Sequence, residues 1–165
     1  MKKVLVIGCP GSGKSTFARA LHTLTGLPIV YMDMLFWNAD KTHVSRDVLI
    51  SRVQAAIAQE AWIIDGNYQS TLEMRFKACD TVFFLDYPLT VCLEGVESRK
   101  GRHRPDMPWV EPADKVDEEF LDYIKAFPKD NTPFIHDLLA RCPDKNIIVF
   151  HTREEAAQYL KRRPV

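Results

Sequence analysis

The sequence has no excess of either charge, no apolar run of membrane-spanning length and no CxxC pair. Lysine plus arginine and aspartate plus glutamate each number 22, so the formal net charge is zero. General binders of nucleic acid or membrane surfaces carry a basic excess, so this balance argues against both classes, although it leaves room for a local basic patch. No apolar run reaches the roughly 20 residues that a transmembrane helix needs.

The cysteine content excludes another class of protein. The four cysteines are too few and too scattered for a disulfide framework, which predicts a reducing, cytoplasmic setting; they are Cys9, Cys79, Cys92 and Cys142. Residues 1–7 have two lysines and then a short apolar run, whereas a secretory signal peptide needs a longer apolar stretch and a small-residue cleavage site. We therefore expect this run to be a buried first strand.

Strand and helix patterns alternate along the chain. Short apolar runs predict five strands, at 4–7, 29–31, 62–64, 81–85 and 147–150. Apolar stripes at helical spacing predict helices at 14–24, 46–59, 69–76, 88–100, 114–127 and 134–140, and a last one opened by a capping box at 152–155. Residues 32–45 and 101–112 are expected to be irregular. A length of 165 residues suits a single α/β domain, 1–165, whose parallel sheet is covered on both faces.

One glycine-rich segment carries most of the functional information. It matches the phosphate-binding pattern GxxxxGK[ST] at every required position and comprises Gly8, Cys9, Pro10, Gly11, Ser12, Gly13, Lys14, Ser15 and the following Thr16. The pattern follows an apolar strand and opens an amphipathic helix, which is the context that its chemistry needs. We name residues 8–15 the P-loop and predict that they bind the phosphates of ATP.

Each part of the P-loop has a physical role. The glycines let successive backbone N–H groups point toward one centre, and the following helix adds the positive end of its dipole. Lys14 supplies a mobile positive charge for the β- and γ-phosphates, Ser15 supplies a hydroxyl ligand for Mg²⁺, and Thr16 supports the α-phosphate. Cys9 is expected to be a packing residue, the alternative being a thiol made acidic by the helix N-terminus.

The rest of the chain narrows the class of P-loop protein. It lacks the DxxG and NKxD elements of switch GTPases, and its short length and early first strand fit the nucleoside-monophosphate-kinase-like branch. In the P-loop and in several other segments, the chain resembles the adenylate-kinase-related proteins of the DNA topology modulation (flagellar-regulator-related) family. Besides the P-loop, the resemblance lies in residues 32–37 (MDMLFW), 64–68 (IDGNY), 85–88 (LDYP), 101–107 (GRHRPDM) and 120–121 (FL).

The resemblance implies a fold and a movable element. The fold is a three-layer αβα P-loop NTPase with a five-stranded parallel sheet of order 2-3-1-4-5, an order that the strand pattern alone does not determine. The movable element is a small lid at about 99–113, which we call the lid segment. In the closer group a Gly-Cys pair usually follows the Arg-Pro-Asp-Met run, whereas residues 110–112 read Val-Glu-Pro in this chain.

The sequence also departs from adenylate kinases at the positions that hold their acceptor. Those enzymes carry an arginine soon after the Asp-Met-Leu element, where Phe36 and Trp37 stand in this chain. They carry a Gly-Phe-Pro-Arg-Thr run after the third strand, where this chain has residues 66–68. Arg46 and Arg75 are the candidates to replace the missing arginines, and AMP is not the expected acceptor.

Three aspartates follow predicted strands, where doubly wound sheets build their sites. Asp65 ends the third strand and is expected to bind the water molecules that coordinate Mg²⁺. The alternative is that Asp65 only forms a turn with Gly66. Asp33 follows the second strand, where similar small kinases place a carboxylate that orients the acceptor; a loop or cap aspartate is the alternative. Asp86 ends the fourth strand and is expected to be structural.

Three arginines of the lid segment are candidate catalytic residues. Arg99, Arg102 and Arg104 would cover the negative charge that spreads during phosphoryl transfer; a solvated basic helix end is the alternative. Asp106 is expected to hold one arginine in place.

Three aromatic residues near the second and third strands have two alternative interpretations. Phe36, Trp37 and Tyr68 either line an acceptor pocket or form local core. Residues 151–156 are expected, by analogy, to pass near the nucleotide base. The basic tail 161–163 is expected to be a solvated helix end and not a nucleic-acid contact.

These features predict a P-loop kinase that transfers a phosphoryl group from ATP, with Mg²⁺, to a small-molecule acceptor. Two alternatives stay open: an ATP-binding regulator of the DNA topology modulation type with little turnover, and a simple NTPase that acts on water. The sequence does not identify the acceptor, decide between ATP and GTP, or distinguish a monomer from a homodimer.

Overall fold

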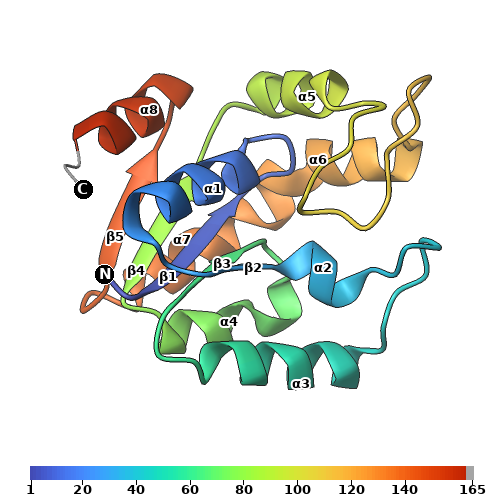
Figure 1. Cartoon of the computed structure of the whole chain (residues 1–165). Coiled ribbons are helices and arrows are strands. Elements are labelled where there is room, and N and C mark those ends of the chain that lie inside the picture. Colours follow the sequence, from blue (N-terminus) through green and yellow to red (C-terminus); the bar gives the residue numbers. More distant parts are fainter. Residues whose placement is uncertain (163–165) are drawn as a thin grey trace.

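The five strands form one all-parallel sheet with the order β2-β3-β1-β4-β5, and this confirms the predicted order. The computed structural model describes residues 1–162, so the last residue of the basic tail 161–163 lies outside it. The strands are β1 (Lys3–Gly8), β2 (Ile29–Tyr31), β3 (Trp62–Asp65), β4 (Thr81–Leu85) and β5 (Asn146–Phe150). Because all five run in one direction, their carboxyl ends meet at a single edge, where the P-loop lies (Figure 1).

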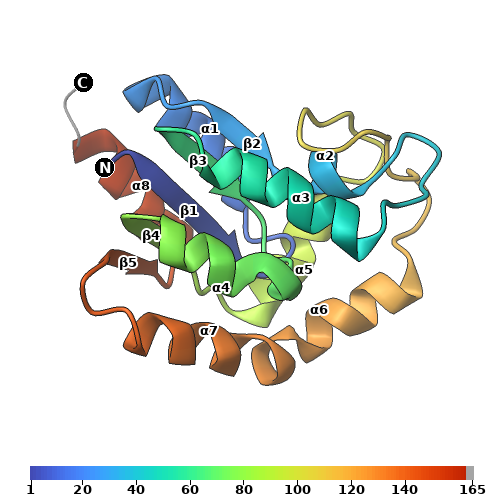
Figure 2. The same ribbon diagram turned by 90° about the horizontal axis from the view of Figure 1, so that it is seen from below.

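Helices cover both faces of the sheet, as predicted. They are α1 (Lys14–Thr25), α2 (Met32–Phe36), α3 (Arg46–Ile57), α4 (Gln69–Ala78), α5 (Leu89–Ser98), α6 (Glu118–Asp130), α7 (Thr132–Ala140) and α8 (Arg153–Arg162). The view from below brings α3, α4 and α7 in front of the sheet, while α1 lies on its other side with α8 (Figure 2). No helix within residues 1–162 is both long and apolar enough to span a membrane.

The core centres on β1 and β4. The side chains of Val4, Leu5, Val6 and Ile7 have no exposed surface, and every residue of β4 is buried. Such continuous apolar runs belong in parallel strands that helices cover on both sides. The burial of these two strands fixes the sheet edge from which the P-loop emerges.

The P-loop turn depends on two glycines with positive φ. Gly11 has a φ of 84°, and Gly13, which precedes α1, has a φ of 89°. A Cβ atom on Gly11 would lie 2.0 Å from the carbonyl oxygen of Cys92 in α5. Helix α5 therefore packs directly on the P-loop, and it leads the chain from there into the lid segment.

The sequence predictions were wrong at two places. A short helix, α2, occupies the first part of the segment 32–45 that was expected to be irregular. The helix expected at 114–127 begins only at Glu118, because the side chain of Asp117 accepts a hydrogen bond from the N–H of Phe120 (3.0 Å) and caps it there. Residues 114–117 therefore extend the connection that contains the lid segment.

Candidate active site

The P-loop opens into a cavity of about 390 Å³. Residues 11–16 line it, so this part of the predicted phosphate cradle faces open space. Arg153, Ala156 and Leu160 of α8 also line this cavity, and the passage of residues 151–156 near a nucleotide base stays a prediction. The first three residues, 8–10, are not among the lining residues and form the base of the turn.

Ser15 and Asp65 form a hydrogen-bonded pair beside Lys14. The Ser15 hydroxyl donates to Oδ2 of Asp65, whose side chain is only 4% exposed. The other carboxylate oxygen, Oδ1, has no hydrogen-bond partner within residues 1–162. Burial raises the pKa of Asp65 to about 6, against the opposing effects of the Lys14 charge and the Ser15 hydrogen bond. A hydroxyl next to a buried carboxylate with one free oxygen is a donor set suited to Mg²⁺.

The loop between β3 and α4 connects the P-loop to Asp33. The side-chain amide of Asn67 accepts a hydrogen bond from the N–H of Gly8 (3.1 Å) and donates one to its carbonyl oxygen (2.6 Å). The next residue, Tyr68, donates its hydroxyl to Oδ1 of Asp33. Burial and the Asp33 charge raise the pKa of Tyr68, which keeps its phenol a donor. One loop therefore positions both the start of the cradle and the candidate acceptor carboxylate.

Arg75 fixes this loop from inside the protein. Its side chain is fully buried, and its guanidinium donates to the carbonyl oxygens of Gly66 (2.7 Å), Asn67 and Tyr68 (3.1 Å). Burial lowers its pKa to about 9, which still leaves the group charged at neutral pH. Arg75 therefore does not take the place of an acceptor-holding arginine in a cavity.

Arg46 does not replace an acceptor-holding arginine either. It is exposed and is not among the residues that line the cavities described in this section. Neither arginine that the sequence offered as a replacement lies where an acceptor would be held.

Two of the three candidate lid arginines belong to one ion-pair network. Arg104 contacts Asp106 (3.0 Å) and Glu111 (3.1 Å), and Arg99 contacts the other oxygen of Glu111 (3.3 Å). Asp106, 2% exposed, also contacts Arg19 of α1 (3.3 Å). The predicted role of Asp106 in holding an arginine agrees with these contacts, whereas Glu111 was not singled out from the sequence.

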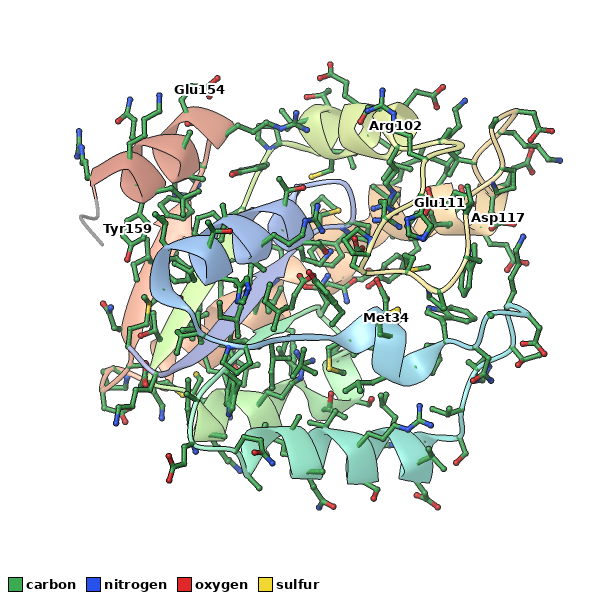
Figure 3. All side chains as sticks on the ribbon, in the orientation of Figure 1. Met34, Arg102, Glu111, Asp117, Glu154 and Tyr159 are labelled. Carbon is green, nitrogen blue, oxygen red and sulfur yellow. The ribbon has the colours of Figure 1, made fainter. Side chains whose placement is uncertain are left out.

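The third arginine lies apart from this network. Arg102 is exposed and lines neither of the two cavities of the site. In Figure 3 it is labelled at the upper edge of the molecule, whereas Glu111 lies closer to its middle. Asp86, expected to be structural, contacts His136 (3.4 Å) and His151 (4.0 Å).

A second cavity, of about 480 Å³, adjoins the first. Asp33, Trp37 and Trp109 of the lid segment are among the residues that line it. Arg99 and Arg104 line both cavities. The two spaces therefore meet at the arginines, with the P-loop on one side and Asp33 on the other.

Comparisons with known proteins bear on the fold. The chain matches no protein-family model and no curated protein in sequence. It resembles the solved shikimate kinase of Acinetobacter baumannii in complex with shikimate, with a TM-score of 0.62 and 16% identity over 98% of this chain and 92% of that one. It also resembles the shikimate kinase of Bacteroides thetaiotaomicron, with a TM-score of 0.61 and 14% identity over 96% and 94% of the two chains. The chain therefore has a shikimate-kinase-like P-loop α/β fold.

Proposed function

We propose that this protein is a P-loop kinase that transfers the γ-phosphoryl group of ATP to a hydroxyl group of a small-molecule acceptor. The observation that carries the proposal is the meeting of two cavities at Arg99 and Arg104. A phosphoryl donor in the P-loop cavity and an acceptor beside Asp33 would face each other across these two cations. A nucleotide-binding protein without an acceptor has no need of the second cavity.

In this proposal the P-loop holds the triphosphate. Backbone N–H groups of residues 8–15 and the N-terminus of α1 bind its oxygens, and Lys14 contacts the β- and γ-phosphates. Thr16 lies next to this cradle, for the α-phosphate. The nucleoside would extend toward α8, along the remainder of the first cavity.

Ser15 and Asp65 are the proposed holders of Mg²⁺. The residues fit the ion, because the free Oδ1 of buried Asp65 and the adjacent hydroxyl offer hard oxygen donors. When bound, Mg²⁺ neutralises charge on the β- and γ-phosphates.

The reaction itself needs little covalent chemistry from the protein. The acceptor oxygen forms a bond to the γ-phosphorus, the bond from that phosphorus to the β-phosphate oxygen breaks, and ADP leaves. Asp33 orients the acceptor hydroxyl and accepts its proton. Arg99 and Arg104 stabilise the charge that spreads over the transferred group, and closure of the lid segment excludes water.

Membership of the DNA topology modulation family and a cytoplasmic setting remain parts of the proposal. The four free cysteines support a reducing compartment in this proposal. The partners are a nucleoside triphosphate and a small acceptor, and either a monomer or a homodimer accommodates them.

A phosphorylation screen tests the function. The protein is incubated with ATP and Mg²⁺, with and without a library of nucleosides, nucleotides and small hydroxyl metabolites, and ADP and phosphorylated products are both measured. A kinase releases ADP faster with one class of acceptor and forms an equal amount of product. Equal ADP release without any acceptor would indicate an NTPase. ATP binding with a change in DNA supercoiling and no product would indicate the regulator.

A further inference from the structure

A continuous row of aromatic side chains connects Asp33 to the lid segment. Tyr68, which donates to Asp33, contacts Phe36 with a ring separation of 5.1 Å. Phe36 contacts Trp37 at 4.8 Å, and Trp37 contacts Trp109 edge to face at 5.0 Å. The row therefore begins at the proposed acceptor carboxylate and crosses from α2 to the lid segment.

The two indoles in this row face a cavity and are not core residues. Trp37 and Trp109 are half-buried and line the second cavity, as does Phe120 of α6. The Arg99 guanidinium lies over the Phe120 ring at 5.5 Å, so the two indoles are the aromatic groups left to contact a ligand ring in this space. Small-molecule sites commonly combine such apolar walls with a few polar groups that fix orientation.

Cationic side chains outnumber acidic ones among the residues that line this cavity, by five to three: Lys41, Arg99, Lys100, Arg104 and Lys115 against Asp33, Glu111 and Asp117. Arg99 and Arg104 share Glu111, and Lys100 pairs with Glu97. Lys41 and Lys115 also line the cavity, and neither makes an ion pair within residues 1–162. A ligand with one anionic group would meet these two ammonium groups.

Building on the proposed kinase activity, we propose that the acceptor is an aromatic-ring alcohol with an anionic group. Its ring lies against Trp37 and Trp109, its hydroxyl faces Asp33, and its anionic group faces Lys41 and Lys115. A nucleotide base and a simple aryl ring both supply this chemistry. The two indoles are largely apolar and would pack against a planar ring whatever its source.

Matched acceptor pairs test the ring and the charge separately. One pair is 4-(hydroxymethyl)benzoate and 4-(hydroxymethyl)cyclohexanecarboxylate, which differ only in aromaticity. The other is cytidine 5′-monophosphate and cytidine, which differ in the phosphate, with ribose 5-phosphate as the form without a base. Binding is measured by isothermal titration calorimetry in the presence of a non-hydrolysable ATP analogue, and turnover is measured from the phosphorylated product. The proposal predicts that, in at least one of the two sets, the compound with both an aromatic ring and an anionic group binds about tenfold more tightly than its matched partners.

Substitutions then assign the preference to residues. Trp37→Leu and Trp109→Leu should each weaken binding of the preferred probe by about tenfold while leaving ATP affinity unchanged. Lys41→Gln combined with Lys115→Gln should weaken binding of the charged member only. Met34→Ala is the matched control, because Met34 is an exposed apolar residue of α2 outside the cavity, visible in Figure 3.

Failures of the two proposals are distinguishable. This inference is overturned, and the kinase proposal is not, if the protein binds ATP but none of the aromatic anionic probes. The same holds if it prefers the saturated compound, the uncharged nucleoside or the sugar phosphate that has no base. Unchanged probe binding in both tryptophan variants, with folding verified by circular dichroism, also overturns it. If ATP does not bind, both proposals fall.

Discussion

Asn67 completes the backbone pairing of Gly8, the first residue of the P-loop. The ladder between β1 and β3 ends at the pair Val6 and Asp65, two residues before Gly8. The side-chain amide of Asn67 then supplies the acceptor and the donor that a further strand residue would supply. A primary amide offers both functions in nearly the geometry of a peptide group. The start of the proposed phosphate cradle is thereby held by a side chain.

We expect Asn67→Ala to loosen the cradle. The substitution leaves the N–H and carbonyl of Gly8 without partners in a buried place, which costs about 1–3 kcal/mol of unfolding free energy. ATP affinity should fall with it, because the cradle is no longer held at its first residue. Urea unfolding and ATP titration measure the two effects. Asn38→Ala, at an exposed loop position, is the control and should change neither. Wild-type ATP affinity in the Asn67 variant would contradict the account.

Arg75 provides the second prediction. Arg75→Met keeps much of the volume but leaves the carbonyls of the β3–α4 loop without their charged donor, and we expect a loss of about 3–5 kcal/mol. Arg75→Lys should recover little of this, since an ammonium group does not reproduce the guanidinium fork. The control is Lys77→Met on the same helix, where an exposed charge pair with Glu73 contributes less than about 1 kcal/mol. Similar stabilities of the Arg75 and Lys77 variants would refute this role.

The buried carboxylate of Asp65 predicts an unusual pH dependence. Its folded-state pKa of about 6 lies above its usual value of 3.8, so the folded protein holds this proton more tightly than the unfolded chain. The corresponding stability is fully present below about pH 4 and is lost as the pH rises through about 6, a change of about 3 kcal/mol without Mg²⁺. Mg²⁺–ATP binding should change in the opposite sense and strengthen over the same interval, since the metal needs the ionised carboxylate.

The Asp65→Asn variant isolates this effect. It has no titrating group at the position, so the difference between wild-type and variant unfolding free energies, measured with a chelator from pH 4 to 8, should follow one ionisation near pH 6. The variant should be the more stable protein above pH 6 and should lose Mg²⁺-dependent turnover. Parallel stability curves for the two proteins would show that Asp65 is not perturbed.

Arg104 and Arg102 form a natural comparison within the lid segment. Arg104 lines both cavities, whereas Arg102 lines neither. Arg104→Ala should lower kcat by roughly 10²–10³-fold, because a cation aimed at the transition-state charge is lost. Arg102→Ala should leave kcat within about twofold, as an exposed charge far from the reacting atoms is screened. Single-turnover kinetics with a saturating acceptor measure both, and equal losses would contradict the assignment.

The sequence predicts well those features that are coded locally. The strand–turn–helix of the P-loop follows from neighbouring residues, because its glycines, its lysine and the apolar strand before it all lie within about 20 positions. The sheet order needed the family resemblance, since strand pairing is non-local, and it was confirmed. The position of Asp65 beside Ser15 follows from the shared carboxyl edge of a parallel sheet.

Other features of the site depend on contacts between distant residues and leave no pattern in the sequence. Nothing near Asn67 indicates that its amide pairs with Gly8, 59 positions away. The burial of Arg75 follows from three loop carbonyls that meet only after α4 packs, whereas the sequence suggested that Arg75 replaces an acceptor-holding arginine. Glu111 stands where the family resemblance breaks off, so its contacts with Arg99 and Arg104 were not anticipated.

The most direct test of the central claim is calorimetric titration of Mg²⁺–ATP into the wild-type protein, the Lys14→Ala variant and the Lys2→Ala variant. Lys14 lines the first cavity, beside the P-loop, whereas Lys2 is an exposed lysine that does not line it. Our account predicts saturable binding to the wild type and to Lys2→Ala, and affinity lower by about 100-fold or more for Lys14→Ala, a loss of about 2.7 kcal/mol. No binding to the wild type, or equal affinity in all three proteins, would contradict it.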